Sequence, residues 1–166
     1  MAKRYDNKAE TKGKALTAAA IVISVTACIF SLNFNTASAH AQKAYEHVKD
    51  NNIDEAIESI NKAINLDGYN EKYVTGFMPV PARPDIKIGL ADLLFAKNDI
   101  LRQKEQNGEK IPESELQALQ RQLSQVNNNI MKLEKKAENN LSLSSNIASF
   151  CFRTGQTDKG LEYLNN

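Results

Sequence analysis

The sequence lacks most of the residues on which small catalytic and disulfide-stabilised domains depend. Its 166 residues include no tryptophan, four prolines, two cysteines and two histidines. Cys28 lies in an apolar stretch, so Cys151 would be alone in the polar part of the chain, and no intrachain disulfide framework is expected. No G-x-S-x-G, phosphate-loop, H-E-x-x-H or C-x-x-C motif occurs. We therefore predict a protein without catalytic residues or a bound cofactor.

The two histidines do not form the start of a metal site. His40 and His47 are seven residues apart and would share one face of a helix. No carboxylate or cysteine at suitable spacing completes a set of metal ligands. We expect no bound metal, with both imidazoles solvated or at an interface.

The positive charge is concentrated at the start of the chain. Residues 1–14 carry five basic and two acidic side chains, whereas residues 35–166 carry 16 basic and 18 acidic ones. Binding to a phosphate backbone requires clustered Lys and Arg, which this nearly neutral body does not have. Nucleic acid is therefore excluded as an expected partner.

A long uncharged segment follows the basic start. Residues 15–34 contain no charged side chain and include nine Leu, Ile, Val and Phe residues. A helix of 20 residues spans about 30 Å, the thickness of the hydrocarbon core of a bilayer. We predict a membrane helix at 15–35, preceded by a basic cytoplasmic segment at 1–14. Residues 36–166 would then form an extracytoplasmic domain of a single-pass cell-membrane protein.

Two other fates of this segment stay open. Ala37-Ser38-Ala39 resembles the cleavage site of a signal peptide, although the apolar run is longer than usual for one. Val25-Thr26-Ala27-Cys28 resembles the sequence at which bacterial lipoproteins are lipidated on cysteine, here Cys28. All three alternatives deliver the remaining chain across the membrane.

Residues 37–70 have the pattern of a helical hairpin. Within 51–70, apolar residues recur every three to four positions and predict one buried helical face, which Asp67-Gly68 ends. The preceding residues 37–50 have a weaker apolar stripe. This pair is similar to a tetratricopeptide repeat, with the pattern residues at Ala44, Ala56, Ile57, Ala63, Ile64 and Leu66.

A second, truncated copy is expected at 140–166. Ala148 fits the small position of the first helix, Gly155 fits the turn, and Leu161 fits the second helix. Because such repeats bury their core only between neighbours, about three are normally needed. We therefore expect the chain to be a fragment of a longer protein, or to have its last face covered by another chain.

The middle of the chain departs from the repeat pattern. Three prolines within 71–84 predict an extended linker, and a long helical hairpin is expected at 85–139, with a turn at Asn107-Gly108. Pro112 and the spacing of Ser114 and Gln117 predict a capped helix start. Six apolar residues then follow at heptad-like spacing: Leu116, Leu119, Leu123, Val126, Ile130 and Leu133. The favoured interpretation is packing within the hairpin, and the alternative is a homo-oligomeric coiled coil through 116–133.

The whole pattern resembles a known family. A basic start, one membrane helix and a repeat ending L-D-G-Y-N-x-x-Y at 66–73 are similar to the last membrane helix and repeat tail of Gram-positive proteins in the O-antigen ligase/polymerase superfamily. The resemblance covers roughly residues 1–75 and, by repeat type, 140–166. It implies an all-α protein: one membrane helix followed by a tetratricopeptide-like solenoid with a long middle hairpin.

The expected function follows from this architecture. The family transfers glycans with a multi-span bundle, which this chain lacks, so the resemblance implies an accessory scaffold in envelope polysaccharide assembly, binding a protein partner or an envelope glycan. The alternatives are a stand-alone membrane or lipoprotein scaffold that binds a peptide or partner helix, and a coiled-coil oligomerisation module.

Overall fold

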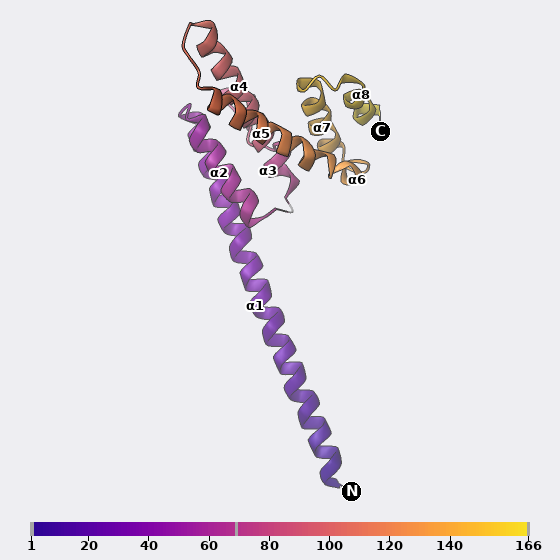
Figure 1. The fold of residues 1–166 in the computed structure, drawn as a ribbon. Helices are drawn as coiled ribbons and strands as arrows, with labels where there is room; N and C mark the ends of the chain where they lie inside the picture. The colour runs from indigo at the N-terminus through magenta and orange to yellow at the C-terminus, as the bar shows by residue number, and fades with distance from the viewer. Residues whose placement is uncertain (1, 69, 166) are drawn as a thin grey trace. The chain divides into compact units, whose positions relative to one another are not determined.

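The computed structural model describes residues 2–68 and 70–165, and residue exposure from Gly13 onwards (Figure 1). The described chain is mostly helical, at 78%. Its contacts divide it into two compact units, Met1–Thr36 and Ala37–Asn166. The elements in chain order are α1 (Ala2–Lys49), α2 (Ile53–Leu66), α3 (Glu71–Thr75), β1 (Pro79–Val80), β2 (Arg83–Lys87), α4 (Leu90–Gln106), α5 (Glu113–Met131), α6 (Glu134–Ala137), α7 (Leu141–Arg153) and α8 (Thr157–Asn165).

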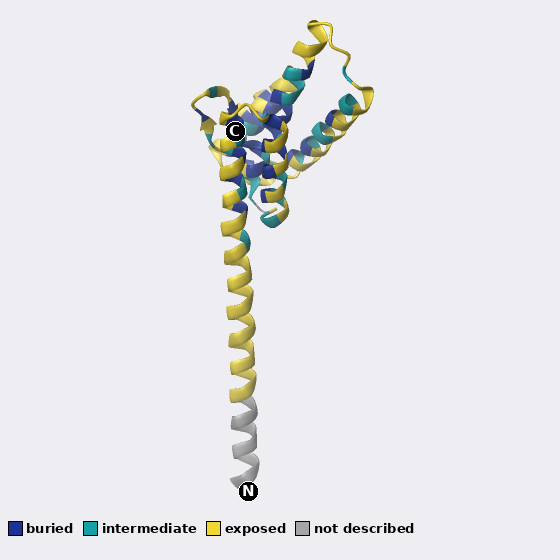
Figure 2. Cartoon of the chain, turned by 90° about the vertical axis from the view of Figure 1, so that its left-hand side faces the viewer, coloured by how far each residue is buried: buried dark blue, intermediate teal, exposed yellow. Residues whose placement is uncertain are grey.

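The part of α1 within the first unit has no apolar packing partner among the described residues. Leu16 is 71% exposed and Phe30 is 65% exposed, and Figure 2 shows nearly all of residues 13–36 exposed. The hydroxyls of Thr17, Thr26 and Thr36 donate to the carbonyls four residues earlier, so they are satisfied inside the helix. This helix is long and apolar enough to cross a membrane, as the sequence predicts.

The second unit begins where α1 acquires a buried face. Ala37, Ala41, Ala44 and Val48 are all at most 3% exposed, and they recur at spacings of four, three and four residues. The face of α2 is also buried, with Ala56, Ile60 and Ala63 fully covered, so both predicted apolar faces are confirmed. The small alanine side chains let neighbouring helices approach closely, while the isoleucines fill the remaining space.

The linker predicted at 71–84 is not wholly extended, because it contains the short helix α3 as well as β1, and β1 pairs antiparallel with β2, which continues to Lys87. The all-α prediction is therefore incomplete. Ile86 and Ile88 are buried on either side of exposed Lys87, which is the alternation of a strand. The expected helical start at Asp85 is wrong, because this residue lies in β2 and α4 begins only at Leu90.

The predicted middle hairpin is formed by α4 and α5, which lie in contact. The turn at Asn107-Gly108 is confirmed, with Gly108 at φ +84°. The capping box is wrong, because α5 begins at Glu113, and its cap carries no side-chain hydrogen bond. All six heptad-spaced residues are buried in or packed against the core of this same chain, as the favoured interpretation predicts.

One lysine connects three helices of the second unit. Lys97 on α4 lies 2.7 Å from Asp54 on α2 and 3.1 Å from Glu115 on α5. The two hydrogen-bonded carboxylates outweigh the effect of partial burial and raise the pKa of the ammonium group. This triad fixes the register of α4 between its two neighbours.

The last hairpin packs through α7 and α8. The side chain of Asn140 caps α7 by accepting the Leu143 amide at 3.1 Å. Gly155 forms the turn at φ +77°. An added Cβ at Gly160 would meet the Phe152 ring at 2.7 Å, so the two helices approach each other closely there.

We predict that Gly89→Ala destabilises the second unit strongly. A Cβ at this position would overlap the backbone N and Cα atoms of Gly76, neither of which can rotate away. The expected loss is about 3 kcal/mol in the free energy of unfolding, measured by urea titration of the detergent-solubilised chain with circular dichroism.

Gly108→Ala is the matched control for this substitution. Its added Cβ would meet nothing within 4 Å, and only the φ of +84° opposes it. We expect a loss of about 1 kcal/mol. Equal losses for the two variants would contradict the close contact between the α3 end and the start of α4.

Candidate binding cleft

The short helix α3 positions one wall of a polar cleft. The side chain of Asn70 caps α3 by accepting the Lys72 amide at 3.3 Å. At the other end, Gly76 has φ +93°, and its N–H donates to the Lys72 carbonyl. This left-handed residue turns the chain out of α3 and towards β1, where the Ile88 amide donates to the Met78 carbonyl at 2.8 Å.

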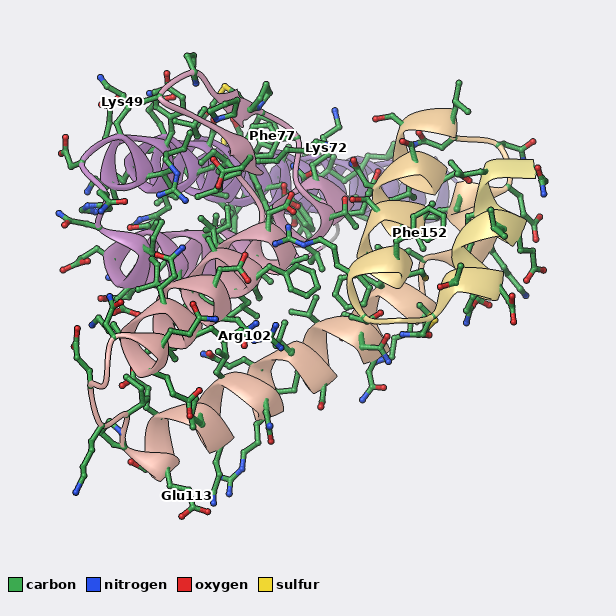
Figure 3. The ribbon with its side chains drawn as sticks, turned by 90° about the horizontal axis from the view of Figure 1, so that it is seen from above. Lys49, Lys72, Phe77, Arg102, Glu113 and Phe152 are labelled. Carbon is green, nitrogen blue, oxygen red and sulfur yellow. The ribbon has the colours of Figure 1, made fainter. Side chains whose placement is uncertain are left out.

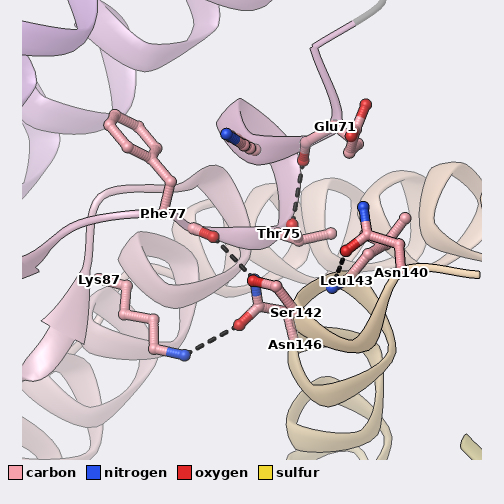
Figure 4. A pocket seen from close by; sticks show the side chains of 10 residues that line it. Glu71, Thr75, Phe77, Lys87, Asn140, Ser142, Leu143 and Asn146 are labelled. Carbon is pink, nitrogen blue, oxygen red and sulfur yellow. Dashed lines mark hydrogen bonds between the residues drawn. The ribbon is translucent and has the colours of Figure 1, made fainter. Parts of the chain in front are cut away.

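A single amide on α7 joins this wall to the opposite one. Asn146 donates through Nδ2 to the Gly76 carbonyl at 2.9 Å and accepts through Oδ1 from Lys87 Nζ at 2.9 Å. Figure 4 shows both hydrogen bonds on one side of the cleft. Asn146 therefore fixes α7 against the end of α3 and holds the Lys87 ammonium group at the cleft.

The cleft between these elements has a volume of about 390 Å³. Most of its lining residues have polar side chains, and they come from the α3 region, β2 and the first turns of α7. Figure 4 shows it from close by. The lining residues are Glu71, Lys72, Thr75, Gly76, Phe77, Lys87, Asn140, Ser142, Leu143 and Asn146.

A second cavity of about 240 Å³ adjoins the first. It is lined by Ser38 and Gln42 of α1 and by Tyr73 and Met78, and it shares Lys72 and Phe77 with the cleft. Figure 3 shows Lys72 and Phe77 close together beside α7. Phe77 is 40% exposed and packs edge-on against Tyr73, with 5.9 Å between the ring centroids. The two adjoining cavities are together called the groove, and Phe77 lines both of them.

A half-buried acidic group, Asp92, lies near the cleft residues Thr75 and Lys87. Asp92 on α4 is 3.0 Å from Arg153 on α7, whose guanidinium also stacks 4.1 Å from the centroid of the Phe95 ring. Burial raises the pKa of Asp92, because desolvation outweighs the opposing effects of Arg153 and Lys87. This cluster holds α7 against α4 and so stabilises the cleft wall.

The residues that match the repeat pattern occupy structural positions. Ala44, Ala56, Ile57, Ala63 and Ala148 are buried, Ile64 and Leu66 pack against the core, and Gly155 forms a turn, whereas Leu161 is 49% exposed. None of them lines the groove.

The remaining predicted positions carry no site chemistry in this structure. Cys28 is exposed on α1, and Cys151 is buried in α7. His40 and His47 are both half-buried on α1. Among residues 13–68 and 70–165, no group of three His, Cys, Asp or Glu side chains could hold a metal ion.

Sequence reasoning missed the cleft residues themselves. Lys72, Lys87 and Asn146 lie in unrelated segments, and the hydrogen bond between the last two joins residues 59 positions apart. No pattern within a short stretch of sequence predicts a contact between residues so far apart in the chain. The capping preference of Asn140, directly before an apolar helical stretch, was the one available clue.

Comparisons with protein-family models, with curated proteins and with solved structures find no match.

We predict that Arg153→Ala destabilises the second unit by about 2 kcal/mol near pH 7, because it leaves the half-buried Asp92 carboxylate without the cation with which it pairs. Because folding raises the pKa of Asp92, the contribution of this group to stability is fully present below the ordinary carboxyl pKa and is lost as the pH rises through the folded value. Loss of Arg153 raises that pKa further, so the destabilisation should be smaller near pH 4. Urea unfolding at both pH values measures it.

The control for this prediction uses Asp92→Asn, which removes the charge and keeps the shape. In that background, Arg153→Ala should lose the stacking on Phe95 and the 3.6 Å ion pair with Asp99, and it should show no pH dependence from Asp92. A pH-dependent loss of the same size in both backgrounds would contradict the role of Asp92.

Proposed function

We propose that this chain is a membrane-anchored interaction module. Its apolar segment at 15–35 holds the protein in the cell membrane as a single span, and unit 37–166 binds or positions other molecules outside the cytoplasm. The proposed role is scaffolding rather than catalysis, with a protein or an envelope glycan as the partner.

The observation that carries this proposal is the contrast within α1. Its apolar residues before Thr36 are exposed, with Ile21 at 59% and Phe34 at 57%, whereas every third or fourth residue from Ala37 is buried. Exposed apolar area of this extent is unfavourable in water by about 25 cal/mol per Å². A bilayer removes that penalty, and the basic residues before Ala15 favour retention of this flank on the cytoplasmic side.

Support for a scaffolding role comes from the second unit. Paired helices such as α7 and α8 bury small residues at their contacts, as tetratricopeptide-like hairpins do. The sequence resemblance to the tails of O-antigen ligase/polymerase-superfamily proteins extends the proposal to envelope polysaccharide assembly, either as part of a larger protein or as a stand-alone module.

The alternatives have less support from individual residues. A homo-oligomeric coiled coil through 116–133 would need the heptad-spaced side chains that α5 already uses within this chain, including Leu119, Val126 and Ile130. A lipoprotein tethered through Cys28 would be cleaved in the middle of the exposed apolar stretch, leaving Ile29, Phe30 and Leu32 next to the lipid.

We predict that paired substitutions Ile21→Lys and Ile29→Lys abolish stable membrane association. Each lysine opposes insertion of the helix by about 2.5–3.5 kcal/mol near the bilayer centre. The matched control carries Leu161→Lys and Leu164→Lys, which are equally exposed apolar positions in the second unit. Carbonate extraction followed by fractionation measures the distribution. Retention of the first variant in the membrane pellet would contradict the anchor.

We predict that a cysteine at Lys110 is labelled from outside the cytoplasm. Lys110 is exposed in the turn between α4 and α5. In a background with Cys28→Ser and Cys151→Ala, Lys110→Cys should react with a membrane-impermeant maleimide in intact cells, and a cysteine at Lys3 should react only after lysis. The reverse labelling would overturn the proposed orientation.

A further inference from the structure

We propose that the cleft between α3, β2 and α7 binds a phosphate-bearing ligand. This inference rests on the proposed function only in treating unit 37–166 as a binding module. Its basis is a set of cationic and hydrogen-bonding groups around one cavity.

The cleft carries an excess of cationic side chains. Lys72 and Lys87 both line it, and neither forms an ion pair with a carboxylate within the described part of the chain. The one acidic lining residue, Glu71, is 3.5 Å from Lys136, which lies outside the lining. Figure 4 shows Glu71 and Lys87 on opposite sides of the cavity. The two lysines of the lining therefore outnumber its one carboxylate; Lys87 also interacts electrostatically with Asp92, whereas the Lys72 ammonium group is left to meet an entering anion.

Uncharged hydrogen-bonding side chains also line the cleft. The hydroxyl of Ser142 lines the cavity and has no hydrogen-bond partner within the described residues. Asn146 is already oriented by its contacts with Gly76 and Lys87. Oxygen atoms of a phosphate accept such bonds readily, and a lysine serves phosphate as a point charge without the planar geometry that a carboxylate pairs with best.

The volume of the cleft also suits a ligand that is larger than a bare phosphate ion. A volume of about 390 Å³ lies at the small end of the range for ligand sites and exceeds the needs of a bare phosphate ion. The adjoining cavity beyond Lys72 and Phe77 offers room for the group that carries the phosphate. The exposed ring of Phe77, between the two cavities, gives that group an apolar surface to lie on. A phosphorylated small molecule or a lipid headgroup meets these requirements equally.

The test titrates the full chain in neutral, phosphate-free maltoside micelles with inorganic phosphate and with glycerol 3-phosphate, followed by calorimetry. We expect saturable binding, tighter for glycerol 3-phosphate. Lys72→Gln should weaken it at least about 5-fold, and Lys72→Gln with Lys87→Gln at least about 20-fold. Lys110→Gln with Lys132→Gln removes the same charge from exposed positions outside the cleft and should change binding less than about 2-fold.

Three results would overturn the proposal: no saturable binding of either probe, an equal loss in the cleft and control variants, or tighter binding of acetate than of phosphate in a parallel titration. Because the Lys72 ammonium group has no partner to lose, Lys72→Gln should keep the unfolding midpoint of the wild type, so its binding loss cannot come from misfolding. Addition of phosphatidic acid to the micelles separates the two sources, since a headgroup ligand would abolish the phosphate titration in the wild type.

Failure of this proposal is distinguishable from failure of the proposed function. Membrane retention and the labelling of Lys110→Cys depend on the apolar segment of α1 and not on the cleft. Retention without phosphate binding would leave an anchored module with another ligand. Phosphate binding without retention would leave a binding unit whose anchor has to be assigned differently.

Discussion

One helix changes its environment along its length, and the rest of the molecule depends on that change. Between Gly13 and Thr36, α1 exposes apolar side chains and has no buried residue. From Ala37 it buries a narrow stripe of alanines and Val48. A helix can be apolar on all sides only where it is surrounded by lipid or protein, and it becomes amphipathic where one side meets water. The change at Ala37 thus separates the proposed anchor from the packed unit.

The small alanine side chains on the buried face of α1 determine how closely the groove residues lie to this helix. Because Ala41 and Ala44 occupy little volume, neighbouring segments approach α1 closely, and the groove reaches α1 at Ser38 and Gln42. The other end of the groove is fixed by Asn146. The same unit therefore combines an apolar core with a solvent-accessible groove. The core sets the positions of the helices, and the polar groups of the groove remain available to a ligand.

Helical periodicity in the sequence predicted the buried faces of the helices, because that spacing depends only on neighbouring residues. The buried faces of 41–48, 53–63 and 116–133 follow from helical periodicity, and they lie where the spacing placed them. The strand at 83–87 was missed because the three prolines within 71–84 indicated a linker, and the alternation of the strand is too short to stand out beside them. The start of α4 and the cleft depend on contacts between distant segments, such as the approach of two glycine backbones, which no window of the sequence contains.

The most direct test of this account is a scan of spin-label accessibility along α1 in bilayers. Single cysteines from Leu16 to Val48, in a background with Cys28→Ser and Cys151→Ala, report contact with lipid-soluble oxygen and with a water-soluble nickel complex. We predict high oxygen accessibility without helical periodicity up to Phe34, then a period near 3.6 residues from Ala37, with minima at Ala37, Ala41, Ala44 and Val48. High nickel accessibility throughout 16–34 would contradict the anchor and, with it, the proposed membrane role.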